Sequence, residues 1–238
     1  MSDVPVFIPV RDRLEPLKEL INWCREAGLS EIYLIDNHST YEPLLRFLAF
    51  SDCHVIYTKK NLGHRSPWLS GAVQRFSNQR IYIVSDPDVI PDRKCPLDVV
   101  QRITDLLNKY PEVVKVGLGL RIDDLPERNP LKNDVVNWEA QFWKNEVEPN
   151  VYLADIDTTF ALYRPYKERQ THTPCLRTGF PYVAKHLPWY KAPEDLTEED
   201  IYYREHANQT VSNWDSNSVS YWKTICGGPP SSEYPSEP

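Results

Sequence analysis

The chain has 238 residues, a hydrophobic content of 41% and a formal net charge of −7 at pH 7. That length suits one large domain or two small ones, and the acidic balance argues against a general nucleic-acid or anionic-membrane surface. No stretch approaches the ~20 apolar residues that a membrane span needs. The first residues also lack the basic and apolar regions of a signal peptide. Composition therefore predicts a globular cytoplasmic protein without a transmembrane segment.

The cysteines support the same compartment. Their number is odd and none forms a CxxC pair, so we expect reduced thiols rather than a disulfide framework or a zinc site. The five cysteines are Cys24, Cys53, Cys95, Cys175 and Cys226.

Strand and helix patterns alternate through the first part of the chain. Short apolar runs rich in β-branched residues predict strands, and apolar residues at i, i+3, i+4 and i+7 predict helices. Such alternation favours a parallel α/β sheet with right-handed crossovers. No GxGxxG follows the first strand and no GxxxxGK[ST] occurs, which disfavours a dinucleotide fold and a P-loop. The expected strands cover residues 4–10, 31–35, 54–58 and 81–84, and the expected helices cover residues 15–27, 42–50 and 68–76.

The second part of the chain mixes the two patterns less regularly. From residue 226 onward the chain is rich in Gly, Pro, Ser and Glu, which predicts a flexible tail. We therefore expect one α/β domain over residues 1–225 and a tail over residues 226–238. In this part the sequence predicts helices over residues 96–110, 135–143 and 198–207, strands over residues 113–122 and within 151–163, and loops over residues 123–133 and 170–179.

Two carboxylates follow the predicted strand over residues 81–84. Asp86 and Asp88 flank Pro87, whose ring ends the strand and fixes the corner. Ligands of open α/β sheets bind just past the carboxyl ends of strands, and two oxygen donors there suit Mg²⁺ or Mn²⁺ together with substrate phosphates. Because Asp and Pro are also ordinary turn residues, an acidic turn is the alternative.

Polar residues also follow the other predicted strands. Arg11, Asp36 and Asn61 each stand where a strand ends. The carboxyl ends of parallel strands meet at one edge of a sheet, so we expect these residues to lie along the same edge as Asp86.

This order of features resembles the GT-A fold glycosyltransferases, and most closely the inverting family-2-like enzymes. The resemblance is carried by a proline-punctuated strand ending in Arg11, by Asp36-Asn37, by Asn61-Leu62-Gly63 and by Ser85-Asp86-Pro87-Asp88. It covers about residues 4 to 210. Two later segments look like the acceptor side of small bacterial or viral sugar transferases, Asp157 to Arg164 and His186 to Tyr190. The implied fold is a Rossmann-like, mostly parallel sheet flanked by helices in a single domain.

The resemblance implies a metal-dependent transfer of a sugar from a nucleoside diphosphate to a carbohydrate hydroxyl, with UDP favoured over GDP or dTDP. Mn²⁺ or Mg²⁺ would neutralise the diphosphate leaving group. Asp88 would bind that metal, and Asp86 would hold the ribose or a metal-bound water. His186 would be a third ligand, with a structural role as the alternative. Core packing is the alternative for Trp189 and Tyr190, which would otherwise stack on a sugar. The implied donor side consists of Pro9, Arg11, Asp36, Asn37, Asn61, Gly63, Arg65 and Asp86.

Inversion at the anomeric carbon needs a base that takes the proton of the acceptor hydroxyl. The candidates are Asp155, Asp157, Glu194 and Asp195, and we favour Asp157 because it lies near a predicted strand end in the acceptor half. Strand alternation puts Asp155 on the same face as Asp157. Capping of a helix or turn is the structural alternative for Asp157.

Two other functions fit the same fold. The first is a sugar-phosphate nucleotidyltransferase, which usually carries a glycine-rich loop after the first strand, where this chain has Arg11-Asp12-Arg13. The second is a module that binds a nucleotide or a glycan without turnover. Turnover of a donor in the presence of Mn²⁺ would separate them.

Overall fold

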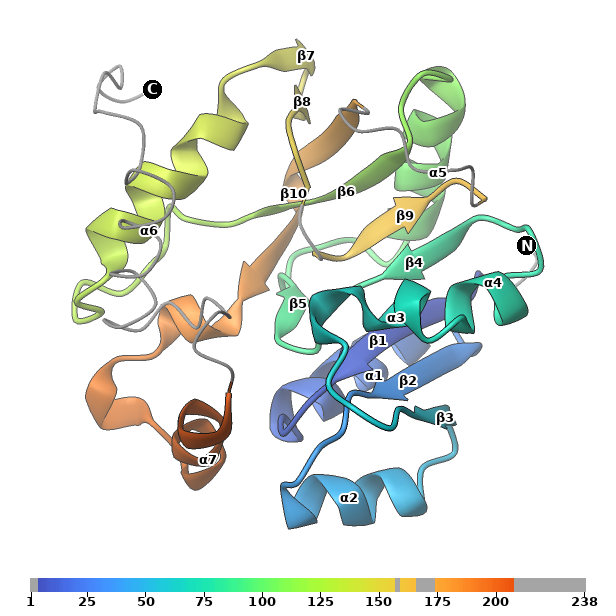
Figure 1. The fold of residues 1–238 in the computed structure, drawn as a ribbon. Helices are drawn as coiled ribbons and strands as arrows, with labels where there is room; N and C mark the ends of the chain where they lie inside the picture. The colour runs from blue at the N-terminus through green and yellow to red at the C-terminus, as the bar shows by residue number, and fades with distance from the viewer. Residues whose placement is uncertain (1–3, 157–158, 166–173, 208–238) are drawn as a thin grey trace.

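In the computed structural model, the described residues are 4–156, 159–165 and 174–207. They form one α/β domain around a ten-stranded sheet whose main order is β3-β2-β1-β4-β9-β6-β10-β8-β7, with β5 paired to β10. Helices cover both faces of this sheet (Figure 1). Within the described residues, no helix is both long and apolar enough to cross a membrane.

The first half of the sheet is parallel, as the alternating pattern predicts. β1 lies between β2 and β4, and β3 extends the sheet beyond β2; all of these pairs are parallel. Val10 pairs with Asp36 at the end of β1 and β2. The carboxyl ends of these strands therefore meet at one edge. The strands are β1 (Val6–Val10), β2 (Ile32–Asp36), β3 (His54–Tyr57) and β4 (Tyr82–Val84).

The second half of the sheet is mixed. β9 runs antiparallel between β4 and β6, whereas β10 is parallel to β6. The far end of β10 also pairs with β5, so that His186 lies opposite Val89. This long strand thus returns to the corner that follows β4. The strands are β5 (Val89–Pro91), β6 (Lys115–Leu120), β7 (Glu146–Glu148), β8 (Val151–Leu153), β9 (Ala161–Tyr163) and β10 (Cys175–His186).

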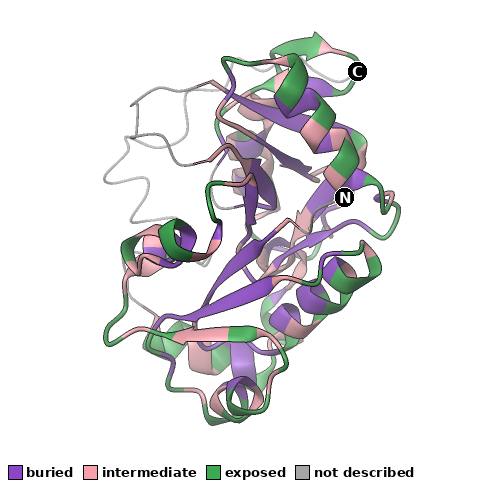
Figure 2. Ribbon diagram, turned by 90° about the vertical axis from the view of Figure 1, so that its right-hand side faces the viewer, coloured by how far each residue is buried: buried purple, intermediate pink, exposed green. Residues whose placement is uncertain are grey.

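Alternating side chains of the parallel strands build two cores. Val6, Ile8 and Val10 face the larger core, which also receives the buried residues of α1, α2 and α5. Phe7 faces the smaller core on the opposite side, under α3 and α4. Figure 2 shows the buried strands between helices whose outer faces are exposed. The helices are α1 (Glu15–Glu26), α2 (Glu42–Ala49), α3 (Ser66–Leu69), α4 (Ala72–Phe76) and α5 (Val99–Lys109).

The remaining helices follow the later strands. α7 stands beside the edge at which β1, β2 and β4 end (Figure 1). The sequence prediction of a helix over residues 198–207 is confirmed by α7. These elements are η1 (Gly63–Arg65), α6 (Lys132–Glu139), η2 (Ala140–Trp143), η3 (Leu187–Tyr190), η4 (Pro193–Asp195) and α7 (Glu198–His206).

Three predicted elements differ in the structure. The strand expected within residues 151–163 is split into β8 and β9, which pair with different neighbours. The helix expected over residues 68–76 breaks at Gly71, whose φ is +79°. The helix expected from residue 96 starts at Val99.

The loop predicted over residues 170–179 is wrong in its second part, because β10 begins at Cys175. The polar sequence misleads here because Arg177 and Thr178 are buried with partners. The Arg177 guanidinium pairs with Glu139, and the Thr178 hydroxyl donates to the carbonyl of Tyr182 at 2.6 Å.

The cysteine prediction holds for the described residues, in which Cys24, Cys53, Cys95 and Cys175 are free thiols. Cys226 and the predicted tail over residues 226–238 lie outside the described residues. The domain limits at residues 1–225 stay a prediction.

Candidate active site

Asn37 joins the end of β2 to the loop that follows β3. Its buried side chain accepts a hydrogen bond from the Leu62 amide at 2.6 Å and donates to Asn61 Oδ1 at 2.8 Å and to the Gly63 carbonyl at 3.1 Å. Gly63 has a φ of +70°, in the left-handed region that favours glycine. The structure thus brings Asn37, Asn61 and Gly63 together, and the two asparagine side chains bind each other.

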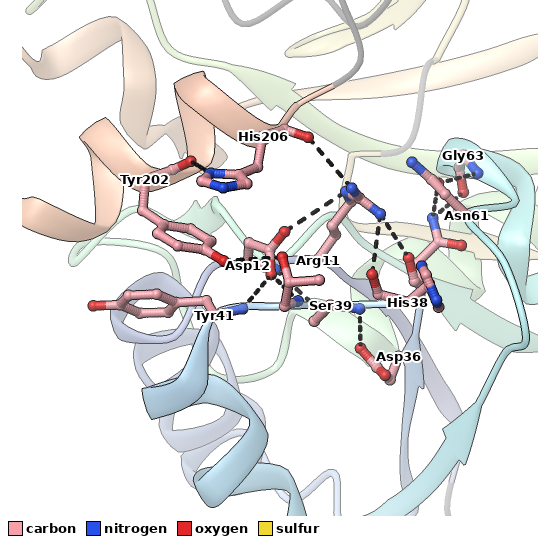
Figure 3. A network of polar contacts seen from close by, with 12 residues as sticks. Arg11, Asp12, Asp36, His38, Ser39, Tyr41, Asn61, Gly63, Tyr202 and His206 are labelled. Atoms are coloured by element: carbon pink, nitrogen blue, oxygen red, sulfur yellow. Dashed lines mark hydrogen bonds and ion pairs between the residues drawn. The ribbon is translucent and has the colours of Figure 1, made fainter.

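Arg11 links three parts of the chain through backbone carbonyls. Its Nη1 donates to the carbonyls of Asn37 at 3.1 Å and His38 at 3.2 Å, and its Nη2 donates to the carbonyl of His206 at the end of α7 at 3.3 Å. Figure 3 shows these contacts around the loop after β1. Arg11 lies at the predicted edge and fastens α7 to it.

Asp12 lies at the same edge in a buried position. It is fully buried, has a φ of +50°, and its Oδ1 accepts the amides of Thr40 at 2.6 Å and Tyr41 at 2.8 Å. Two unpaired amides at the start of α2 are thereby satisfied. Asp12 therefore fixes the position of α2 relative to β1.

The other predicted donor residues occupy different surroundings. Pro9 is buried inside β1, where it pairs with Ile35. Asp36 is 4% exposed, and its Oδ1 accepts the Ser39 amide at 3.1 Å. Arg65 ends η1 and is half-buried.

Asp88 lies at the corner between β4 and β5. Its Oδ2 is 3.5 Å from Nε of Arg13, and its Oδ1 is 3.8 Å from Nε2 of His186. The Asp88 carbonyl accepts the Leu187 amide at 2.9 Å. The antiparallel pairing of β5 with β10 accounts for the approach of His186. The structure thus brings Asp88 and His186 together, while the role of His186 as a metal ligand stays a prediction.

Arg13 is held among carboxylates and an aromatic ring. Its side chain is 8% exposed, its Nη1 lies 3.4 Å from Asp200 Oδ1, and its guanidinium carbon is 4.0 Å from the centre of the Tyr203 ring. Burial alone lowers the pKa of Arg13, but the charges of Asp88, Tyr203 and Asp200 raise that pKa above its ordinary value. Arg13 is thus a fixed positive charge beside Asp88.

The negative charges of both carboxylates at the corner act on the Tyr203 phenol. Burial raises the pKa of its phenol, Arg13 lowers it, and the negative charges of Asp88 and Asp86 raise it further. Asp86 therefore belongs to the same electrostatic environment as Asp88 and Arg13.

α7 reaches the start of α1 through Glu199. One oxygen of this 6% exposed carboxylate accepts the amides of Leu14 at 2.8 Å and Glu15 at 3.1 Å. Burial raises the pKa of Glu199, although these two amides lower it. Glu199 supplies a capping carboxylate to a helix start that has none of its own.

The donor atoms at the corner suit a hard divalent cation. Mg²⁺ is usually held by one or two carboxylates together with substrate phosphates, and Asp88 with Asp86 offers such a pair. Among the described residues, no group of three or more His, Cys, Asp or Glu side chains converges as a complete metal centre. The corner therefore fits a partial cation site that a phosphorylated ligand would complete.

Of the two favoured bases, Asp155 alone is among the described residues. It lies beside the start of β10, where the amide of its neighbour Ala154 donates to the Cys175 carbonyl at 3.2 Å. Asp155 is exposed, its carbonyl accepts Arg177 Nε at 2.7 Å, and the neighbouring Ile156 is buried. Asp157 lies outside the described residues.

Asp195 and the aromatic pair have structural partners. Asp195 accepts the Ala192 amide at 3.1 Å and pairs with Arg128, while Glu194 is exposed. Trp189 is 3% exposed and belongs to the main core. The Tyr190 hydroxyl donates to Asp124 at 2.6 Å. Core packing, rather than sugar stacking, describes Trp189.

Arg13, Glu199, Asp200 and Tyr203 were not identified from the sequence. Arg13 stands two residues after Arg11 in a loop already marked as a strand end, which is a usable signal. Among the three α7 residues, Asp200 belongs to a capping box with Thr197 that the sequence shows, but only the tertiary contacts bring the three to the corner.

No protein-family model matches the chain. None of the curated proteins matches it. Solved structures do match. Glucosyl-3-phosphoglycerate synthase from Mycobacterium tuberculosis in complex with Mn²⁺ and UDP aligns with a TM-score of 0.42 at 15% identity, over 68% of this chain and 56% of the synthase. UDP-glucose pyrophosphorylase from Acinetobacter baumanii aligns with a TM-score of 0.48 at 9% identity, over 95% of this chain and 99% of that one. This chain thus spans little more than half of the synthase.

Proposed function

We propose that the protein is a GT-A type glycosyltransferase that moves a sugar from a nucleoside diphosphate, UDP first, to a carbohydrate hydroxyl. The observation that carries this proposal is the corner after β4, where Asp88 lies between Arg13 and His186 at the edge where parallel strands end. This edge is the usual ligand position in such sheets.

Asp86 and Asp88 would hold Mg²⁺ or Mn²⁺ together with the phosphates of the donor, and His186, 3.8 Å from Asp88, would join them only when these phosphates complete the site. When bound, the cation would neutralise the charge that develops on the diphosphate leaving group. Arg13 adds a permanent positive charge 3.5 Å from Asp88. A buried guanidinium in this position attracts phosphate oxygens and pre-organises the site for negative charge.

On the acceptor side, a carboxylate would take the proton of the attacking hydroxyl. Asp157 remains our first candidate and Asp155 the second. This choice rests on the resemblance and on strand alternation, which would put the two carboxylates on one face. A resulting inversion of the anomeric carbon is part of the proposal.

The rival reaction is nucleotidyl transfer to a sugar phosphate. The buried Arg13 beside Asp88 favours it as well, because a fixed cation after β1 suits a triphosphate. The two reactions differ in their products. A transferase releases UDP from a UDP-sugar, whereas a nucleotidyltransferase forms UTP from a UDP-sugar and pyrophosphate.

The test is to incubate the protein with a panel of UDP-sugars, a panel of carbohydrate acceptors and Mn²⁺, with and without pyrophosphate, and to separate the nucleotides. The proposal predicts UDP release that requires the metal. Asp88→Asn should lower the rate by about a hundredfold, the equivalent of roughly 3 kcal/mol of charge stabilisation. Asp105→Asn, an exposed acid on α5, is the matched control. UTP formation would establish the rival reaction, and binding without any turnover would establish a binding module.

A further inference from the structure

α7 is attached to the sheet edge chiefly by polar and aromatic contacts. Its only buried residues are two acids, Glu199 and Asp200, while its one aliphatic side chain, Ile201, is 48% exposed. Helices normally dock by burying an apolar stripe. A helix held in this way is a candidate for reversible docking, since its contacts are replaceable by water or by ligand groups.

The contacts of α7 converge on groups that serve the corner. Asp200 and Tyr203 both contact Arg13, and Glu199 holds the two amides that follow Arg13. Docked α7 therefore keeps Arg13 in the position from which it contacts Asp88.

Arg13 and a divalent cation would share the same carboxylate. A Mg²⁺ ion binds carboxylate oxygens at about 2.0–2.1 Å, and Arg13 Nε is 3.5 Å from one oxygen of Asp88. Two positive charges on one carboxylate repel each other strongly in a site of low exposure. Binding of the cation would therefore weaken the contact between Arg13 and Asp88, and that contact would in turn weaken cation binding.

We propose that docking of α7 and binding of a divalent cation at Asp88 oppose each other through Arg13. In the cation-free protein, Arg13 neutralises Asp88 and α7 holds Arg13. Cation binding moves Arg13 away from Asp88 and loosens α7. The inference rests on the proposed function, because it requires a cation at Asp88.

Thermodynamic linkage makes the proposal testable from both sides. If the cation loosens α7, then loosening α7 must tighten cation binding by the same factor. Glu199→Ala removes the two amide contacts of α7. Glu199 acts on Arg13 only through its charge. The substitution also removes a negative charge, which on its own would weaken cation binding, so the proposed effect has the opposite sign.

The experiment titrates Mn²⁺ alone into the full chain and measures free Mn²⁺ by electron paramagnetic resonance. We expect binding that is lost in Asp88→Asn and about fivefold tighter in Glu199→Ala, at the lower end of usual coupling. Glu198→Ala removes a charge from an exposed neighbour and should not tighten binding. Tyr203→Leu, which changes no charge at neutral pH, gives a second variant that should also bind more tightly.

Hydrogen exchange of the amides of residues 198–206 gives an independent readout, and it should become faster when Mn²⁺ is added. If Mn²⁺ binds through Asp88 but neither variant tightens it and α7 exchange is unchanged, the coupling is wrong while the proposed site survives. If Mn²⁺ binding does not depend on Asp88, both the proposed cation site and the proposed coupling are wrong.

Discussion

Arg13 and Asp88 form an ion pair between the loop that follows β1 and the corner that follows β4, with Nε 3.5 Å from Oδ2. Both side chains are largely buried, at 8% and 13% exposed. The corner proposed to bind a metal thus contains a cationic side chain of the protein itself. Because Arg13 also contacts Asp200 of α7, the docking of α7 can affect the cation binding proposed at Asp88.

Asp200→Asn should loosen α7. Asp200 is 4% exposed and contacts both Arg13 and Lys191, and removing one partner of a buried ion pair is costly. We expect docking of α7 to weaken by roughly 2–4 kcal/mol. Faster amide exchange over residues 198–206 measures this, with the exposed Glu205→Gln as control. Equal exchange in the two variants would contradict the assignment of Asp200.

The difference in α7 docking between wild type and Asp200→Asn should depend on pH. Although burial raises the pKa of Asp200, hydrogen bonds from Lys191 and Thr197 lower that pKa overall. A folded pKa below the unfolded value, about 3.9, means that the contribution is complete at neutral pH and is lost as pH falls through the folded pKa. The difference between wild type and Asp200→Asn should persist from pH 7 to about pH 4 and shrink below that. A difference that grows on acidification would contradict a lowered pKa of Asp200.

Asp12→Ala should destabilise the whole domain. It leaves the amides of Thr40 and Tyr41 without their acceptor and puts alanine at a φ of +50°. We expect a loss of about 2–4 kcal/mol in the free energy of unfolding. Asp12→Asn keeps an acceptor oxygen and tolerates the left-handed region, so its loss should stay below about 1 kcal/mol. Urea denaturation compares the two, and equal losses would exclude the capping role.

Asn37→Ala should loosen the loop at residues 61–63. The side chain makes three hydrogen bonds there from a position that is 4% exposed. A loss of about 2 kcal/mol is expected, against no loss in Asn108→Ala, an exposed position on α5. If Asn37→Ala costs no more than this control in a urea titration, the bridging role of Asn37 is wrong.

The parallel half of the sheet could be predicted from sequence because its strands are short apolar runs bounded by helices with clear periodicity. That topology alone predicted an edge with Arg11, Asp36 and Asn61, and the structure adds Asn37, which follows Asp36 and contacts both Arg11 and Asn61. The same reasoning could not show that Asn37 and Asn61 bind each other, since a polar residue at a strand end can face a ligand or a neighbour.

The mixed half of the sheet was harder to predict. Arg177 and Thr178 indicate a loop by composition, yet they belong to β10 because Glu139 and the Tyr182 carbonyl satisfy them in the interior. Similarly, Glu199 has no local feature that distinguishes it from a surface acid, and Thr197-Glu198-Glu199-Asp200 indicates for Asp200 only a capping box at the start of a helix. Their role depends on Arg13 and on the start of α1, which lie far away in the chain.

The most direct test of the central claim is a thermal-shift measurement with UDP, with and without Mn²⁺. At a nucleotide concentration about a hundred times its dissociation constant, binding should stabilise the protein by roughly 2.7 kcal/mol. The account predicts a shift that requires Mn²⁺, disappears in Asp88→Asn and remains in Asp105→Asn. A shift that is unchanged in Asp88→Asn, or no shift with UDP at saturating Mn²⁺, would contradict a UDP site at the corner of Asp86 and Asp88.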